Sequence, residues 1–249
     1  MAAQPIKSII LLSIIVLVFQ DVFSQQKPDS LRRYHVNTDF TLASKNVWRG
    51  INYGNNAPSL QGNLSLRSDV MEFGAMGTVT TNGTKSGYGN WLELYSSYTY
   101  KRWSLTIDDY YFFSYDSLND YLTWNYNTTQ HLVEARLKYA VDKRFSIFAS
   151  YNIYANRYAS KALYLEGEYF LRKDLSLLVS YLTGKSSLNF YDKGRITMIG
   201  IAGTRLIPIT STFALPIKVS LIVNPNYKGI AHYEGLGRNP VNFVIATSL

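Results

Sequence analysis

Charged residues recur at every second position in several short segments of this chain. The clearest segment places Glu134, Arg136 and Lys138 among apolar residues, and Glu166 and Glu168 repeat the spacing. Side chains two residues apart lie on the same face of a β-strand, so this spacing predicts strands with one charged face and one apolar face. Charges of both signs on one face can pair with each other or line a water path that sorts solutes by charge. The sequence leaves both possibilities open.

Ten residues are candidates for lining such a path. Nine of them share the polar parity of their predicted strands, and Arg49 precedes a glycine in a predicted turn. Arg49 either reaches inward at the rim or pairs with carboxylates of the loops. The pore-lining candidates are Arg49, Arg67, Glu93, Asp108, Glu134, Arg136, Lys138, Glu166, Glu168 and Lys218.

Catalytic chemistry finds little support in the sequence. His35, His131 and His232 lie in different segments, and no Gly-x-Ser-x-Gly nucleophile motif is present. A lipid hydrolase, with His131 beside Ser160 or Ser114 on an outer wall, is the enzyme alternative. Cysteine is absent and no residues show metal-ligand spacing. We therefore expect no catalytic residues, no metal and no cofactor, and a protein that is not an enzyme.

The candidate residues belong to a repeating pattern of short alternating segments. This period of two continues from residue 34 to the end of the chain and predicts twelve strands. They cover approximately 34–45, 60–67, 73–81, 91–100, 103–114, 133–139, 145–156, 162–171, 175–183, 195–206, 217–224 and 241–249.

The connections between these strands alternate in length. Those after even-numbered strands are short, and those after odd-numbered strands are mostly longer. Alternating turns and loops are typical of transmembrane β-barrels, whose short turns face the periplasm. We expect an all-β fold: a transmembrane, antiparallel, up-and-down β-barrel of about 12 strands over residues 34–249. A soluble β-sandwich is the alternative, but it need not alternate its loop lengths.

The N-terminal residues read as an export signal. An apolar run over 9–19, interrupted only by Ser13, follows a single lysine at position 7, and residues of small or modest size (22–24) precede Gln25. We expect a signal peptide over 1–24 and a periplasmic lead-in over 25–33, although an uncleaved anchor is the alternative. Aromatic residues form 15% of the chain and charged residues only 17%, below the roughly 25% charged residues of soluble domains. These features predict a location in the outer membrane of a Gram-negative bacterium.

Some segments do not fit a regular barrel. Asp108 and Asp109 are adjacent, so a regular strand would turn one of them toward lipid unless it lies at the interface or a bulge intervenes. The strand over 195–206 is apolar on both faces, and residues 46–54 break the alternation as a loop or bulge.

Prolines and aromatic residues add two further expectations. Pro208 and Pro216 are expected to bracket a turn, because proline cannot donate to a strand ladder. Tyrosine and tryptophan at strand ends are typical of an interfacial girdle. The expected girdle contains Tyr34, Trp91, Tyr98, Tyr100, Trp103, Tyr111, Tyr139, Tyr151 and Tyr169.

The segments 44–52 (SKNVWRGIN) and 58–62 (PSLQG) resemble the opening hairpin of the TorF-type porins. Similarity continues through 93–98 and 105–115, and extends over most of the chain after the signal peptide. Lys45 departs from the family, in which an acidic residue is common at this position. The resemblance implies an outer-membrane barrel and suggests a channel, without naming a solute.

Together these features predict a porin that passes small hydrophilic solutes through a charged lumen by passive diffusion. The alternative is a closed barrel that acts through its outer loops as an adhesin, a receptor or a structural protein. The net charge of +8 is compatible with contacts to lipopolysaccharide phosphates as well as with ordinary solvated loops. Expected partners are outer-membrane lipid, lipopolysaccharide, the solutes and the barrel-assembly machinery. No nucleic acid is expected, because the lysines and arginines are dispersed.

Overall fold

A computed structural model describes residues 34–81, 89–113, 121–155, 161–186, 189–233 and 235–248. The predicted signal peptide (1–24) and periplasmic lead-in (25–33) lie outside these ranges. No helix within the described ranges is long and apolar enough to cross a membrane.

Twelve strands form one closed barrel, as the alternating pattern predicts. Each strand pairs antiparallel with its neighbours, and β1 meets β14 through Thr41 and Ser248, which closes the wall. The barrel strands are β1 (His35–Ala43), β4 (Ser59–Arg67), β5 (Met71–Thr80), β6 (Trp91–Tyr100), β7 (Trp103–Phe112), β8 (His131–Ala140), β9 (Phe145–Tyr154), β10 (Leu163–Arg172), β11 (Leu175–Leu182), β12 (Arg195–Pro208), β13 (Ala214–Val223) and β14 (Val241–Ser248).

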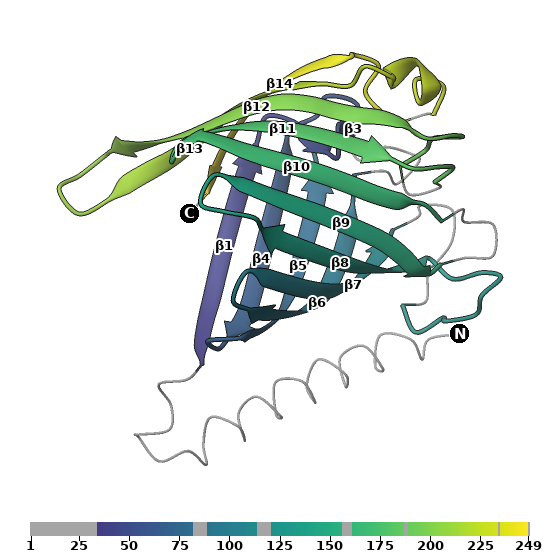
Figure 1. The fold of residues 1–249 in the computed structure, drawn as a ribbon, viewed down its shortest axis with the longest axis horizontal. Helices are drawn as coiled ribbons and strands as arrows, with labels where there is room; N and C mark the ends of the chain where they lie inside the picture. The colour runs from purple at the N-terminus through teal and green to yellow at the C-terminus, as the bar shows by residue number, and fades with distance from the viewer. Residues whose placement is uncertain are drawn as a thin grey trace, which may run out of the picture. The chain divides into compact units, whose positions relative to one another are not determined.

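The two ends of the barrel differ in the length of their connections. Short turns join β4 to β5, β6 to β7, β8 to β9, β10 to β11 and β12 to β13. Both the start of β1 and the end of β14 lie at this end, which we call the turn end (Figure 1). Longer connections gather at the opposite end, which we call the loop end. A short 3-10 helix, η2 (Tyr227–Gly229), lies in the last of them.

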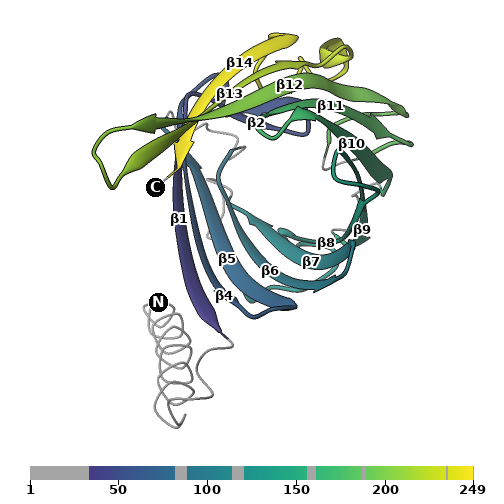
Figure 2. The same ribbon diagram turned by 60° about the vertical axis from the view of Figure 1, so that its left-hand side comes forward.

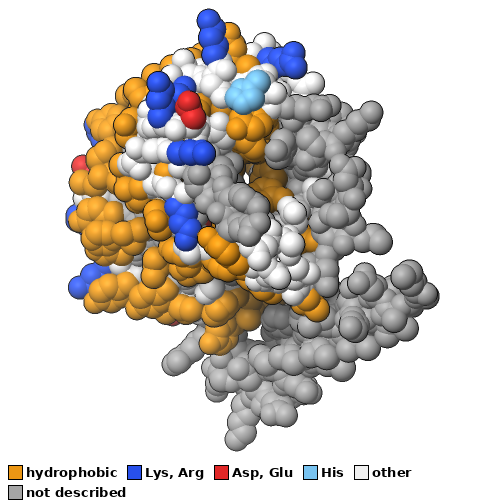
Figure 3. Space-filling model, turned by 90° about the vertical axis from the view of Figure 1, so that its right-hand side faces the viewer, with side chains coloured by type: hydrophobic (Ala, Val, Ile, Leu, Met, Phe, Trp, Pro, Cys, Tyr) orange, Lys and Arg blue, Asp and Glu red, His pale blue; other side chains and the backbone are white. Residues whose placement is uncertain are grey.

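Alternation along the strands gives the barrel an apolar outer wall. Leu137 on β8 is 40% exposed, whereas its neighbours on the other parity, including Glu134, turn inward. Leucine, isoleucine, valine and phenylalanine side chains are exposed in the same way along most strands. Hydrophobic side chains cover the flank of the barrel in Figure 3, while lysine and arginine side chains are scattered over the loop end that faces the viewer.

Pro208 and Pro216 lie on either side of a turn, as predicted, but the strands extend further than expected. Both prolines lie within strands, and the turn covers residues 209–213. Pro216 pairs with Leu206 on β12, but the pairing of β13 with β14 begins only at Ile217. Pro216 therefore has a strand neighbour on one side only, and a ladder position of this kind tolerates a missing N–H.

The strand that is apolar on both faces becomes regular through a register shift. The pairing of β11 with β12 passes from Ser180–Met198 to Tyr181–Ile196 and skips Thr197. Thr197 and Met198 are both buried, while Ile199 and Ile201 are exposed on the outer wall. A bulge of this kind changes the parity of a strand and so lets an apolar run serve both faces.

The segment over 46–54 is neither a plain loop nor a bulge in the wall. It forms a separate two-stranded hairpin of β2 (Asn46–Trp48) and β3 (Ile51–Tyr53), which folds into the barrel from the first long connection (Figure 2). All six of its strand residues are buried or half-buried, and Ile51 has no exposed surface. The lumen near the loop end is therefore occupied by the protein's own chain.

Candidate functional site

The turn of the hairpin presses directly against the opposite wall. Gly50 has φ +81°, and a Cβ atom there would lie 2.1 Å from the carbonyl oxygen of Thr197 on β12. Asn224 donates a hydrogen bond from Nδ2 to the Gly50 carbonyl oxygen over 3.0 Å. Only glycine combines this backbone conformation with so close an approach. The Arg-Gly pair of the sequence is thus the tip by which the hairpin is seated.

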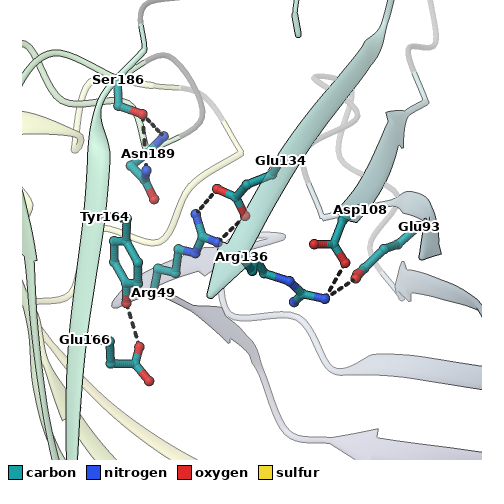
Figure 4. A network of polar contacts seen from close by, with 9 residues as sticks. All are labelled: Arg49, Glu93, Asp108, Glu134, Arg136, Tyr164, Glu166, Ser186 and Asn189. Atoms are coloured by element: carbon teal, nitrogen blue, oxygen red, sulfur yellow. Dashed lines mark hydrogen bonds and ion pairs between the residues drawn. The ribbon is translucent and has the colours of Figure 1, made fainter. Parts of the chain in front are cut away.

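Arg49 extends from this tip to a carboxylate on β8. Its Nη1 and Nη2 donate to the two Glu134 oxygens over 2.9 and 2.5 Å, and both side chains are almost fully buried (Figure 4). The guanidinium carbon also lies 4.3 Å from the Trp48 ring centroid and 4.5 Å from that of Tyr164. Two-point hydrogen bonding and aromatic stacking are the interactions that suit a buried arginine. Arg49 therefore reaches inward, and its carboxylate partner is on a strand rather than a loop.

A second ion-pair group lies beside the first. Arg136 on β8 donates from Nη2 to Asp108 on β7 and to Glu93 on β6, the latter over 3.2 Å (Figure 4). Asp108 has no exposed surface and Glu93 very little. In the two groups together, two guanidinium groups face three carboxylates. The centre of the lumen therefore holds an excess of one negative charge when all five groups are ionised.

Three further candidates lie closer to the turn end. Lys138, Glu166 and Glu168 line a cavity of about 220 Å³ with Arg49 and Arg136. Tyr164 donates a hydrogen bond to Glu166 over 2.7 Å. These side chains face the interior, and their role as pore-lining residues stays a prediction.

The last two candidates, Lys218 and Arg67, lie apart from these groups. One lines another part of the lumen and the other lies at the end of its strand. Lys218 on β13 lines a cavity of about 420 Å³ with Lys45 and Thr41. Arg67 is exposed at the end of β4, where it is in register with Glu72 of β5. Arg67 therefore lies at the turn end and does not belong to the ion pairs around Arg49.

Aromatic residues that the sequence did not identify as part of a site pack against the hairpin. The Trp48 ring lies 6.0 Å from Trp91 on β6 and 5.6 Å from Tyr110 on β7, and Tyr53 lies 5.7 Å from Trp91. Trp91 is only 4% exposed, so its assignment to an outer girdle is wrong. The sequence pattern could have placed both residues inside the barrel. Trp91 is two residues from Glu93 and Tyr110 is two residues from Asp108, so each shares the inward face of its strand.

A cavity of about 500 Å³ lies next to these aromatic rings. Trp48, Trp91 and Tyr110 line it, together with Asn46, Glu93 and Arg136. Three of the residues that line it carry a buried polar atom without a hydrogen-bond partner among the described residues, namely Asn46 Nδ2, Trp91 Nε1 and the Tyr110 hydroxyl. The cavity therefore combines aromatic surface with unpaired polar groups.

His131 and Asp109 form a separate pair on the outer wall. His131 Nδ1 lies 2.8 Å from Asp109 Oδ1, and its Nε2 lies 2.5 Å from the Tyr121 carbonyl oxygen, to which it must donate. The Trp124 ring stacks on the imidazole at 3.9 Å. The adjacent aspartates are thus accommodated on opposite faces of β7. Asp108 turns inward, and Asp109 faces outward and pairs with His131. Both ring nitrogens have partners, and the suggested Ser114 and Ser160 lie outside the described residues.

Comparisons with known proteins identify no family for this chain. No family model matches, and no curated protein sequence matches either. A solved KdgM porin has 11% identity and a TM-score of 0.45, with 86% of this chain and 98% of that chain covered. A solved NanC porin has 10% identity and a TM-score of 0.45, with coverages of 85% and 98%. Likeness at this level carries no argument about function, and the TorF-type resemblance stays a prediction.

Proposed function

We propose that this chain forms a passive pore for small hydrophilic solutes in a bacterial outer membrane, with the β2–β3 hairpin as its constriction. The apolar outer wall suits contact with lipid. Charged side chains turn into the interior, as a water-filled path for solutes across the membrane requires. Lipopolysaccharide contacts and delivery by barrel-assembly machinery follow from this location as parts of the same proposal.

The observation that carries the proposal is the unfilled interior between the hairpin and the turn end. Cavities of about 500, 420 and 310 Å³ are bordered there by polar side chains such as Gln61, Ser220 and Glu168. A barrel with a purely structural role would be expected to fill this space with side chains, as small barrels do. Twelve strands enclose more room than eight, and this chain leaves that room open.

Planar-bilayer conductance of the purified full chain tests the proposal. Discrete conductance steps that change in size or ion selectivity in Glu166→Gln, which removes one lumen charge, would support a pore. An outward control, Tyr169→Phe, should leave the steps unchanged because Tyr169 is exposed on the other parity of β10. Absence of any step from folded protein would refute the pore.

One observation favours a second candidate, a closed barrel that acts through its loop end. The hairpin contacts residues of β6, β7, β8, β10 and β12, so it extends across the lumen. If the hairpin is permanent, solutes cannot pass and function must lie in the outer loops. Silent bilayers with wild-type protein, and also with variants that release the hairpin, would favour this candidate.

A further inference from the structure

We propose that the cavity lined by Trp48 and by the wall of β6 and β7 is a solute-binding site for neutral, polyhydroxylated molecules, of which sugars are the main class. This inference rests on the proposed pore and names the class of solute that it would recognise. It comes from the unequal way in which the hairpin is attached to the two sides of the lumen.

On the side of β8, β12 and β14 the hairpin is held by directional polar contacts. Asn52 donates from Nδ2 to Asn242 Oδ1 over 3.0 Å and accepts from the Gly237 N–H over 2.8 Å. The Arg49–Glu134 pair and the bond from Asn224 to Gly50 complete this attachment. These groups satisfy one another, so this side of the hairpin is closed.

On the side of β6 and β7 the contacts are aromatic, and polar groups are left over. Among the described residues, Asn46 Nδ2, Trp91 Nε1 and the Tyr110 hydroxyl are buried without a hydrogen-bond partner. Unpaired buried donors are rare because each has lost water without replacement, so each requires an explanation. Three of them around one cavity are explained together if an occupant supplies the missing partners.

The chemistry of the three groups restricts that occupant. The indole N–H and the amide NH₂ only donate, and the phenol donates or accepts. The occupant must therefore present acceptor oxygens. The rings of Trp48, Trp91 and Tyr110 pack on one another, and once Trp48 moves away they would offer flat apolar surface. Such surface suits the C–H face of a sugar ring whose hydroxyl oxygens accept at its edge. The cavity of about 500 Å³ is within the usual size of small-molecule sites.

The charges beside the cavity favour a neutral solute over an acidic one. Glu93 and Arg136 line the cavity, and Arg136 also pairs with the buried Asp108. Two carboxylates share this one guanidinium, so a third carboxylate brought by the solute would meet a local excess of negative charge. The solute reaches the covered donors as Trp48 moves away from β6 and β7, on the side where the hairpin packs through aromatic contacts.

Equilibrium dialysis of the detergent-purified full chain against labelled maltose tests this site without requiring conduction. We expect saturable binding to wild type, about tenfold weaker in Trp91→Leu, which loses ring and donor, and a smaller loss in Trp91→Phe, which keeps a ring. Trp103→Leu is the matched control, because Trp103 is 47% exposed on the outer wall and stacks on Tyr139 there. Retained heat-modifiable mobility on gels shows that each variant is folded.

The charge requirement has its own comparison. Glucose and glucuronate share a ring and differ by one carboxylate, and each is measured as a competitor of maltose. Glucuronate should compete several-fold less well than glucose. This loss is the size expected from the repulsion between its carboxylate and an unbalanced carboxylate of the protein at high effective dielectric. Equal or stronger competition by glucuronate would overturn the neutral-solute assignment.

The results separate this inference from the pore itself. No saturable maltose binding to folded wild type, or equal losses in the Trp91 and Trp103 variants, would overturn the site even if the protein conducts. Binding that depends on Trp91 in a protein that shows no conductance would support the site and refute the pore. Binding that depends on Trp91 in a conducting protein supports both.

Discussion

Removing the Arg49 guanidinium should release the hairpin and widen the lumen. Arg49→Met keeps much of the side-chain volume that packs between Trp48 and Tyr164, but leaves Glu134 as a buried carboxylate without its cation. Breaking a buried ion pair in this way costs about 3–5 kcal/mol. The barrel wall does not depend on this contact, so the cost is expected to act on hairpin docking. At 1.4 kcal/mol per tenfold, docking should weaken by roughly a hundredfold to a few thousandfold.

Single-channel recording in planar bilayers measures this effect directly. Arg49→Met should show longer or larger open events than wild type, while its unfolding midpoint in urea changes little. Glu134→Gln should have a smaller effect, because the amide still accepts a hydrogen bond and Arg49 keeps its aromatic partners. The double variant Arg49→Met/Glu134→Gln should lie closer to wild type than Arg49→Met does, since it contains no unpaired buried charge.

Two results would contradict this role of Arg49. Conductance of folded Arg49→Met equal to that of wild type would mean that the hairpin does not limit the passage. A double variant as open as the single variant would mean that the unpaired carboxylate is not the cause, because a double-mutant cycle isolates that coupling.

Three further predictions address other parts of the molecule. Gly50→Ala should also open the lumen, because its Cβ would lie 2.1 Å from the Thr197 carbonyl oxygen; recordings identical to wild type would show that the tip is not seated there. Leu137→Arg places a charge on the outer wall and should destabilise the barrel in liposomes by about 2–4 kcal/mol, whereas an unchanged urea midpoint would argue against lipid contact at this position. Hydrogen bonds from the Arg144 and Phe145 amides lower the pKa of Asp142, so its ionised form adds stability above the unfolded pKa of about 3.9 and loses it as pH falls through the lower folded pKa. Asp142→Asn should thus be less stable than wild type near neutral pH and equal to it in strong acid, and a pH-independent difference in urea midpoint would contradict this account.

The barrel wall was predictable from sequence because one rule governs it. Each wall strand must place apolar side chains outward, so residues such as Leu137 and Glu134 reveal their faces by parity alone. The alternation of short and long connections then assigns each connection to one end of the barrel. The sequence missed that β13 continues through Pro216, where the strand lacks a neighbour on one side. It also wrongly placed Trp91 outside, although this residue has inward parity.

The hairpin was not predictable in the same way, because its conformation depends on contacts with distant residues and not on a repeating pattern. Its pattern breaks the period of two, so the sequence indicated only an irregular segment with an arginine and a glycine. The partners of that pair, Glu134 and Thr197, lie 85 and 147 residues further along the chain (49 to 134 and 50 to 197). No local rule connects residues so far apart until the barrel has closed around them.

The wall and the hairpin are expected to differ in how easily they open. The wall is held by continuous backbone pairing, whereas the hairpin is held by a few hydrogen bonds on one side and by aromatic contacts on the other. Local opening occurs where hydrogen bonds are fewest, so the hairpin should move before any wall strand does. Hydrogen exchange of the full chain in detergent micelles can check this order: the Trp48 and Ile51 amides should exchange much faster than the amides of β8 and β12, and faster still in Arg49→Met. Protection of the hairpin equal to that of the wall would mean that it is a permanent plug, and would favour the closed barrel over the pore.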